Sequence, residues 1–197
     1  MNLQNPKKFK MLVDQAHEVA LHVLRPVSRK YDKAEHAYPK ELDMLASLVD
    51  GMNEGGESMN AGAAGAGNRS ESDNEGNRNG TNMSTALSII EMCYGDTGLL
   101  LSMPRQGLGN SAIAAVANDE QLERFKGTWA AMAITESGCG SDSAAIRTTA
   151  IKDGDDYILN GEKIFVTSGE RADSVVVWAT LDKKLGRAAI KSFVVPK

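Results

Sequence analysis

The sequence predicts an α+β protein in which an all-α helical bundle is followed by an antiparallel β-sandwich or barrel-like domain. Apolar residues recur at three- and four-residue steps through the first half of the chain, and from Trp129 onward the period changes to two. Asp153-Gly154 and Asn160-Gly161 are dipeptides that favour two-residue hairpin turns between antiparallel strands. Because the helices precede the strands and do not alternate with them, the α+β class fits better than an α/β sheet.

Helices are expected at five places in residues 1–127. Pro26 closes the first apolar pattern, whereas Pro39 opens the second helix and Gly51 ends it. Asn118 caps the last helix, with Gln121 three residues later as in a capping box. The expected helices cover residues 12–24, 39–51, 83–94, 108–117 and 119–125.

Residues 51–82 differ in composition from the helices on either side. Gly, Asn, Ser, Glu and Ala dominate this stretch, and it contains no aromatic residue. Such a segment cannot bury enough apolar surface to offset the entropy of ordering it, so we expect a flexible loop. Its glycines lack the strand–glycine–helix context of a dinucleotide fingerprint, which disfavours a phosphate-binding loop and leaves a substrate lid as the alternative.

Residues 128–197 are expected to form the β-domain, with the domain boundary near Gly127. Short runs of β-branched and apolar residues are separated there by turn residues, which is typical of strands. The expected strands cover residues 129–134, 148–152, 157–159, 163–167, 174–180 and 191–195.

Charge and cysteine usage exclude several classes of protein. The formal net charge is −4 over 197 residues, with acidic and basic residues mixed, so there is no electrostatic footprint for nucleic acid or an anionic membrane. Cys93 and Cys139 make no disulfide framework and have no metal-like partner nearby. No apolar run approaches the ~20 residues of a membrane span, and the first residues lack the apolar region of a secretory signal. These features predict a reduced, cytoplasmic protein without a metal site.

The segment Ala133–Asp142 carries the clearest candidate for a binding site. Gly138 and Gly140 follow a strand-like apolar run, and glycines let backbone N–H groups approach a bulky anionic or planar ligand. Thr135 and Ser141 add hydroxyls that both donate and accept hydrogen bonds. The pattern indicates a cofactor cradle, with an ordinary turn as the alternative.

This segment resembles the flavin-contacting signature of the acyl-CoA dehydrogenase family, usually written Thr-Glu-Pro-Gly-x-Gly-Ser-Asp. A second segment of that family follows at the expected distance, over residues 160–169, and the upstream stretches 106–109 and 118–121 also match. The resemblance implies FAD bound against the β-domain. The residues implied to contact FAD are Met132, Ala133, Ile134, Thr135, Gly138, Gly140, Ser141, Phe165, Val166 and Thr167.

The resemblance also implies particular roles for some of these residues. Thr135 would hydrogen-bond the pyrimidine side of the flavin and Thr167 its reactive edge, while Phe165 would pack near the ring face. Ser141 would also touch the acyl-CoA substrate. Residues of this chain depart from the family pattern at Ser137, where proline is usual, at Phe165, where tryptophan is commoner, and at Met132, where a larger residue is frequent.

Other ionisable residues are expected to be structural. Glu136 and Asp142 are more simply explained as shaping the turn or binding backbone N–H groups than as an acid–base pair. The histidines His17, His22 and His36 lie in the helical region without a catalytic constellation, and we expect them to be solvated or partly packed. The family places its catalytic glutamate in a C-terminal helical domain, so no residue of this chain is assigned as the catalytic base.

The resemblance implies an oxidoreductase that converts an acyl-CoA thioester to a trans-2-enoyl-CoA in fatty acid β-oxidation. Electrons would pass to an electron-transferring flavoprotein, and a complete enzyme would form a homo-oligomer or join a partner subunit. The resemblance covers nearly all of this chain but only about the first half of a complete enzyme. A truncated, non-catalytic remnant that binds flavin, CoA or a partner protein is therefore the alternative hypothesis.

Overall fold

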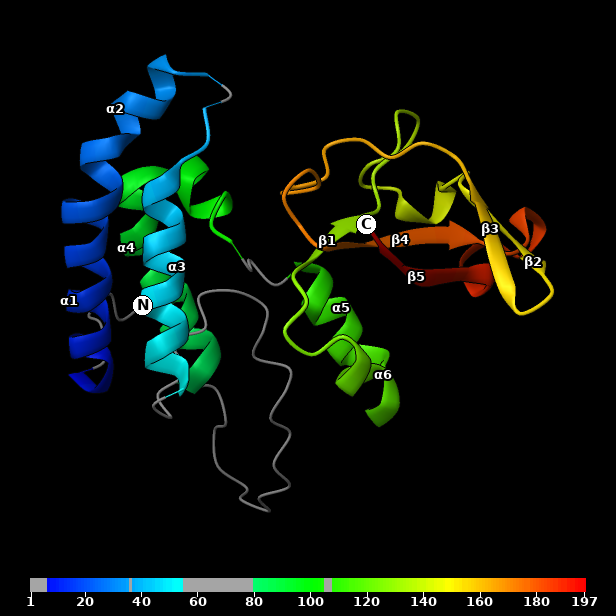
Figure 1. The fold of residues 1–197 in the computed structure, drawn as a ribbon, viewed down its shortest axis with the longest axis horizontal. Helices are drawn as coiled ribbons and strands as arrows, with labels where there is room; N and C mark the ends of the chain where they lie inside the picture. The colour runs from blue at the N-terminus through cyan, green and yellow to red at the C-terminus, as the bar shows by residue number, and fades with distance from the viewer. Residues whose placement is uncertain (1–6, 36, 55–79, 105–107) are drawn as a thin grey trace, which may run out of the picture. The chain divides into compact units, whose positions relative to one another are not determined.

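The computed structural model describes residues 7–35, 37–54, 80–104 and 108–197, and it divides into two compact units, Met1–Gln106 and Gly107–Lys197. Figure 1 shows helices in the first unit, and a sheet with helices α5 and α6 in the second. The α+β class is thus confirmed. The division precedes the helix α5 (Leu108–Val116) and does not lie near Gly127, because α5 packs against the first strand, β1 (Ala130–Ala133).

One long helical stretch occupies the start of the first unit, and Pro26 does not end it. Proline lacks an N–H, and its ring clashes with the carbonyl four residues earlier in an α-helix. A π-helical turn directly before Pro26 accommodates this, since the Arg25 N–H donates to the Ala20 carbonyl five residues back. The stretch comprises η1 (Lys7–Phe9), α1 (Lys10–Val19), η2 (Ala20–Leu24) and α2 (Arg25–Lys33).

Two further helices in the described part of the first unit are longer than the sequence predicted. Helix α3 (Lys40–Glu54) begins directly after Pro39, as expected, but continues past Gly51. Helix α4 (Gly80–Leu101) begins before residue 83 and continues beyond residue 94. Both extensions shorten the expected loop at residues 51–82, whose middle part, 55–79, lies outside the described residues.

Helix α4 contains a break at Asp96, where φ is −171° and ψ is 120°. The Asp96 carboxylate accepts a hydrogen bond from the Leu99 N–H at 2.8 Å, so it caps the helical turn that follows the break. The same carboxylate accepts a hydrogen bond from the Ser28 hydroxyl on α2. Asp96 therefore both starts the last turn of α4 and ties that turn to its neighbour.

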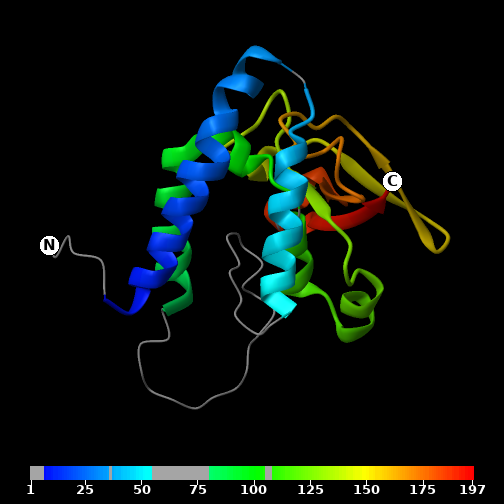
Figure 2. The same cartoon turned by 60° about the vertical axis from the view of Figure 1, so that its left-hand side comes forward.

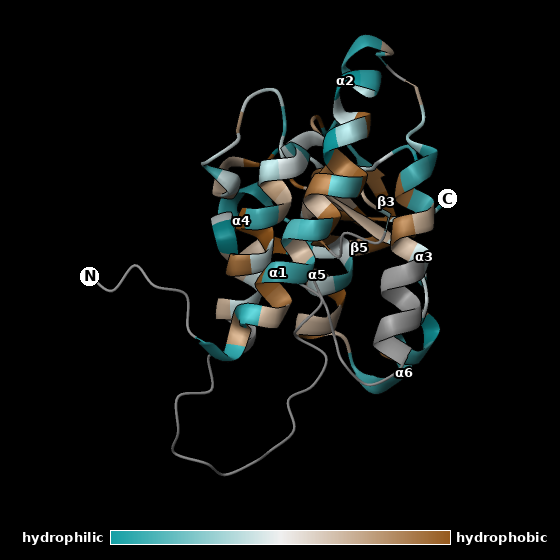
Figure 3. Cartoon of the chain, turned by 90° about the vertical axis from the view of Figure 1, so that its left-hand side faces the viewer, coloured by the Kyte–Doolittle hydropathy of each residue, from teal (hydrophilic) through white to brown (hydrophobic). Residues whose placement is uncertain are grey.

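The core of the first unit lies between α1, η2, α3 and α4. In Figure 2 α1 and α4 run side by side, and Figure 3 shows hydrophilic and hydrophobic stretches along the same helices. Leu99 and Leu100 are buried in this core, whereas Leu101 is exposed. The buried members of the cluster are Ala16, Leu24, Leu42, Leu45, Met92, Leu99, Leu100 and Met103.

The second unit begins with two short helices, α5 and α6 (Asp119–Arg124). Asn118 caps α6, and its side chain accepts from the Gln121 N–H at 2.9 Å. The Gln121 side chain accepts in return from the Asn118 N–H at 3.1 Å. The predicted capping box is confirmed.

The five strands form one open sheet that is mixed, where an antiparallel sandwich or barrel was predicted. The central strand β4 pairs in parallel with β1 and antiparallel with β5, while β2 and β3 form an antiparallel hairpin. β1 and β4 can run parallel because the long connection between them leaves room for a crossover. The remaining strands are β2 (Thr149–Asp153), β3 (Asp156–Asn160), β4 (Ser174–Thr180) and β5 (Ile190–Pro196).

One predicted hairpin is confirmed and one is wrong. Asp153 pairs with Asp156 across a two-residue turn in which Gly154 has a φ of +61°. Asn160-Gly161, in contrast, leads into an irregular segment, and residues 163–167 are not a strand. Gly161 lies against Thr148, where an added Cβ would stand 2.4 Å from the Thr148 Oγ1.

None of the helices in the described part of the chain combines the length and apolar character needed to cross a membrane.

Candidate functional site

Two segments of the second unit meet beside the sheet, one following β1 and the other following β3. The Ile164 N–H donates to the Thr135 carbonyl at 2.9 Å. The Lys163 ammonium donates to the Ile134 carbonyl, also at 2.9 Å. The structure thus joins the two segments that the sequence singled out, at the position of Thr135.

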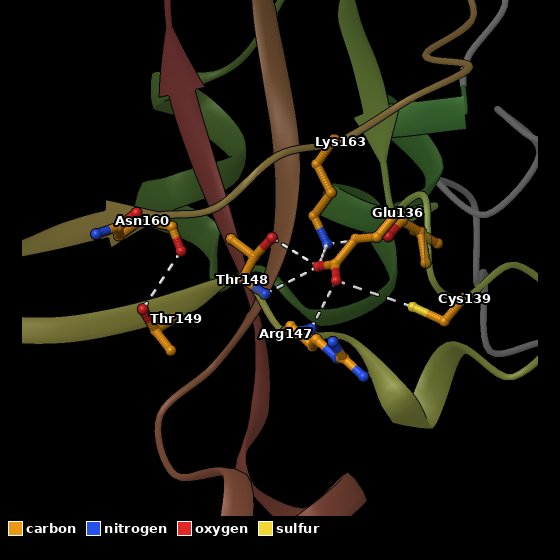
Figure 4. A network of polar contacts seen from close by, with 8 residues as sticks. Glu136, Cys139, Arg147, Thr148, Thr149, Asn160 and Lys163 are labelled. Carbon is orange, nitrogen blue, oxygen red and sulfur yellow. Dashed lines mark hydrogen bonds and ion pairs between the residues drawn. The ribbon is translucent and has the colours of Figure 1, made fainter.

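The Glu136 carboxylate lies next to this junction and accepts hydrogen bonds from several donors (Figure 4). Its Oε1 accepts from the Lys163 Nζ at 2.8 Å, from the Thr148 Oγ1 at 2.6 Å and from the Thr148 N–H at 2.9 Å. Its Oε2 accepts from the Arg147 N–H at 2.7 Å. The expectation that Glu136 binds backbone N–H groups is confirmed. Lys163, however, had no predicted role, since a lysine in a strand-like run gives no sign of its partner.

Hydrogen bonding decides the charge of Glu136. Burial raises the pKa of this carboxyl, but the hydrogen bonds from Lys163, Thr148 and Arg147 outweigh burial and lower the pKa to about 2. A carboxylate that stays ionised and fully occupied by donors is a poor general acid or base near neutral pH. Glu136 is therefore an anchor of the local structure.

Acid is expected to destabilise the second unit through this carboxylate. The folded pKa of about 2 lies below the ordinary value of 4.5, so the stabilisation is complete above pH 4.5 and is lost as the pH falls toward 2. The full loss amounts to about 3 kcal/mol of unfolding free energy. This loss of unfolding free energy can be measured by urea unfolding at a series of pH values between 7 and 2.5.

Two variants assign that pH dependence. Glu136→Gln should flatten it, whereas Glu162→Gln, which changes an exposed carboxylate nearby, should keep the parent slope. An unchanged slope in Glu136→Gln would place the acid-sensitive group elsewhere.

The glycines after Glu136 border open space. Backbone hydrogen bonds of 3.0 and 3.1 Å between Glu136 and Cys139 close a tight turn that contains Ser137 and Gly138. A Cβ added at Gly138 or Gly140 would meet nothing within 4 Å, and neither residue needs a positive φ. The fold itself therefore does not require glycine at these two positions, which leaves their backbone accessible to a bound molecule.

Phe165 stands out on the facing segment. Its side chain is 87% exposed, and its φ of 57° lies in the left-handed region that residues with a Cβ rarely adopt. Ser168 has a similar φ of 59°. An exposed aromatic side chain on a strained backbone is typical of a functional segment that the surrounding structure holds in place.

The predicted cofactor residues differ in what they can offer a ligand. Thr135 and Val166 are half-buried and Ser141 and Thr167 are exposed, whereas Ala133 is buried in β1 and can offer only its backbone. In the part of the chain that the structure covers, no protein group is hydrogen-bonded to the hydroxyls of Thr135, Ser141 or Thr167. Met132 and Ile134 are half-buried, and Gly138, Gly140 and Phe165 are exposed.

The remaining singled-out residues take no part in this junction. His17 stacks on Tyr94, with ring centroids 5.6 Å apart, and its Nδ1 lies 2.8 Å from the Glu91 carboxylate. His22 pairs with Glu18 at 3.1 Å. The Asp142 side chain is exposed, and its backbone carbonyl accepts from Ala145. His36 and residues 106–107 lie outside the described residues.

Helices followed by a mixed, open sheet, with two hydrogen-bonded segments beside it, define an α+β protein. The family model described as acyl-CoA dehydrogenase, middle domain, matches residues 131–197 of the chain. The solved structure of butyryl-CoA dehydrogenase from Megasphaera elsdenii is 25% identical, with a TM-score of 0.75 over all of this chain and 50% of that one. Residues 131–197 thus match the middle domain of the acyl-CoA dehydrogenase family, and the chain as a whole is similar to members of that family.

Curated relatives are similar over most of the present sequence. The 3-(aryl)acrylate reductase of Clostridium sporogenes is 33% identical over 188 residues, which cover 91% of this chain and 45% of the relative. The cyclohex-1-ene-1-carbonyl-CoA dehydrogenase of Syntrophus aciditrophicus is 28% identical over 200 residues, which cover 95% of this chain and 43% of the relative. The chain thus spans about half the length of the curated relatives it matches.

Proposed function

We propose that the chain forms the FAD-binding part of an acyl-CoA dehydrogenase that converts an acyl-CoA thioester to a trans-2-enoyl-CoA. The observation that carries the proposal is the junction of the two segments at Thr135, with exposed Phe165 on one segment and the open Gly138 and Gly140 on the other. Unpartnered hydroxyls, an aromatic ring and accessible backbone fit the polar edge, flat face and pyrophosphate of FAD.

FAD, when bound, supplies the acceptor for a hydride from the substrate β-carbon. The chain's own residues bind and orient the flavin. Thr135 and Thr167 offer hydroxyls to the polar edges of the ring, and Phe165 shields one face of the ring from water. Ser141 offers a hydroxyl to the acyl-CoA as well as to the cofactor. The Glu136 carboxylate is occupied by its hydrogen-bond donors and removes no proton. We assign none of the described residues as the catalytic base.

A flavin at the same site can accept electrons as a saturated carbon–carbon bond is oxidised to a double bond, or supply them as a double bond is reduced. One observation favours reduction as a second candidate, because the relative that is 33% identical is named a 3-(aryl)acrylate reductase. In an enzyme that contains this chain together with a catalytic base, oxidation of an acyl-CoA by a dye acceptor, compared with reduction of an arylacrylate by a reduced dye, separates the two. Transfer of electrons to an electron-transferring flavoprotein, assembly into an oligomer and a cytoplasmic location stay predictions.

The proposal is tested by titrating the full chain with FAD and following flavin absorbance and fluorescence. We expect binding by the parent chain and a Kd about tenfold weaker for Phe165→Ala, because one aromatic stacking contact contributes about 1 kcal/mol or slightly more. Thermal stability should not fall, since the Phe165 side chain is 87% exposed. We expect flavin binding without turnover by this chain alone.

Ile158→Ala provides the matched control, because it removes another exposed apolar side chain, from the β2–β3 hairpin. Its FAD affinity should equal that of the parent. A parent chain that fails to bind FAD refutes the proposal and leaves a partner-binding module as the alternative.

A further inference from the structure

We propose that Lys163 and Glu136 act as a clamp that fixes the Phe165 segment against Thr135, and that this clamp sets the affinity of the site for flavin. The inference rests on the proposed function, since it concerns the same site. Both residues act through others and are positioning residues. Neither belongs to the set expected to contact the cofactor.

The bonds from the second segment reach three consecutive residues of the first. The Lys163 ammonium donates to the Ile134 carbonyl at 2.9 Å and to the Glu136 carboxylate at 2.8 Å. Between them, the Ile164 N–H donates to the Thr135 carbonyl at 2.9 Å. Because the ammonium holds the residues before and after Thr135, neither segment can slide past the other without breaking a buried charged hydrogen bond.

The clamp is attached to the sheet and not only to loops. Glu136 accepts from the backbone N–H groups of Arg147 and Thr148, which lead into β2. The Thr148 carbonyl in turn accepts from the Thr180 N–H at the end of β4, at 2.9 Å. The position of the Phe165 segment is therefore set by the central strand through Thr148, Glu136 and Lys163.

Phe165 depends on these contacts because it has little packing of its own. Its side chain is 87% exposed and its φ is 57°, so neither burial nor backbone preference holds it in place. Its neighbours supply that restraint: Lys163 is 9% exposed and Ile164 is hydrogen-bonded to Thr135. Loss of the Lys163 ammonium should release the strained segment and displace the aromatic ring.

Burial makes the pair strongly coupled. The side chains of Glu136 and Lys163 are 8% and 9% exposed, so removing one charge leaves the other buried without its partner. Removing both charges avoids this, because two neutral side chains of similar shape replace the pair. A Lys163→Met variant and the double variant Glu136→Gln/Lys163→Met therefore separate the loss of the clamp from the effect of a stranded charge.

The test combines amide hydrogen exchange of the full chain without flavin with FAD titration of the same variants. In Lys163→Met and in the double variant, exchange of the Ile164 amide should accelerate about tenfold or more, while the β4–β5 amides keep the parent rate. FAD should bind about tenfold more weakly, with altered visible circular dichroism of the bound flavin. Lys152→Met, which removes an exposed ammonium from β2, should match the parent in every measurement.

The outcomes are distinguishable. Unchanged Ile164 exchange in both variants overturns the clamp. Accelerated exchange with parent-like FAD affinity also overturns the inference, since the pair would then only stabilise the fold. A parent chain that binds no FAD refutes the proposed function, and this is seen before any variant is compared.

Discussion

Replacing Gly109 with alanine is expected to destabilise the second unit by about 3 kcal/mol, at the upper end of the range for overpacked sites. Gly109 lies on α5 where the helix contacts β1, and an added Cβ would stand 2.4 Å from both the Ala130 and Ala131 carbonyl oxygens. These are backbone atoms of a paired strand, so they cannot move aside as a flexible side chain would. Relief requires α5 to lift from the sheet, which exposes Ile113 and the cluster it forms with Val176.

The sign of this effect is diagnostic. At an unobstructed helix position, glycine to alanine stabilises by up to about 1 kcal/mol, because alanine has the better helix propensity. Urea unfolding of Gly109→Ala should therefore show a lower midpoint, where propensity alone gives a higher one. Gly140→Ala is the control, since nothing lies within 4 Å of its added Cβ, and its midpoint should change little. A Gly109→Ala midpoint above that of the parent would contradict the close packing of α5 on β1.

Features that depend on a few neighbouring residues could be predicted from the sequence. The capping box at Asn118 and Gln121 needs only residues three apart, and the turn after Asp153 needs only a glycine with positive φ. The helix after Pro39 is set by local chemistry in the same way. These elements were found because the information for them lies within one turn of the chain.

Other features depend on partners far away in the sequence. Pro26 does not end its helix because a π-helical turn absorbs the proline, and nothing in the local pattern distinguishes that outcome from a stop. The parallel pairing of β1 with β4 joins Ala130 to Ser174 and has no hairpin signal. Alternating side chains at residues 163–167 predicted a strand, but this segment bonds to the residues after β1 and takes no place in the sheet.

The candidate site shows the same division. Its expected contact residues could be proposed from the sequence because glycines, threonines and an aromatic residue form a recognisable pattern around Thr135 and Phe165. Its internal support was not, because the Glu136–Lys163 pair joins residues 27 apart in the chain. A buried ion pair leaves no periodic trace in a sequence, so Lys163 is found only once the two segments are seen together.

Gly161 provides the second large expected effect, and it separates two explanations for the same glycine. As part of an Asn160-Gly161 turn, Gly161 would be replaceable by asparagine, which tolerates left-handed backbone. The structure places an added Cβ 2.4 Å from the Thr148 Oγ1 and 2.7 Å from the Thr148 Cα and Cβ. Both Gly161→Ala and Gly161→Asn should therefore lower the unfolding free energy by about 3 kcal/mol, measured by urea unfolding.

The consequence of that clash reaches beyond stability, because Thr148 is the residue that links Glu136 to the sheet. Its hydroxyl and its N–H both donate to the Glu136 Oε1, at 2.6 and 2.9 Å, so displacing Thr148 withdraws two of the donors that hold the carboxylate. Gly154→Asn is the control: its φ of +61° suits asparagine and nothing lies within 4 Å of an added Cβ, so its stability should stay within about 1 kcal/mol of the parent, whereas at Gly161 a φ of +155° adds backbone strain to the clash with Thr148. Equal stability of Gly161→Asn and Gly154→Asn would mean that Gly161 serves a turn. A selective loss in Gly161→Asn, accompanied by weaker FAD binding, would mean instead that close packing against Thr148 supports the flavin site.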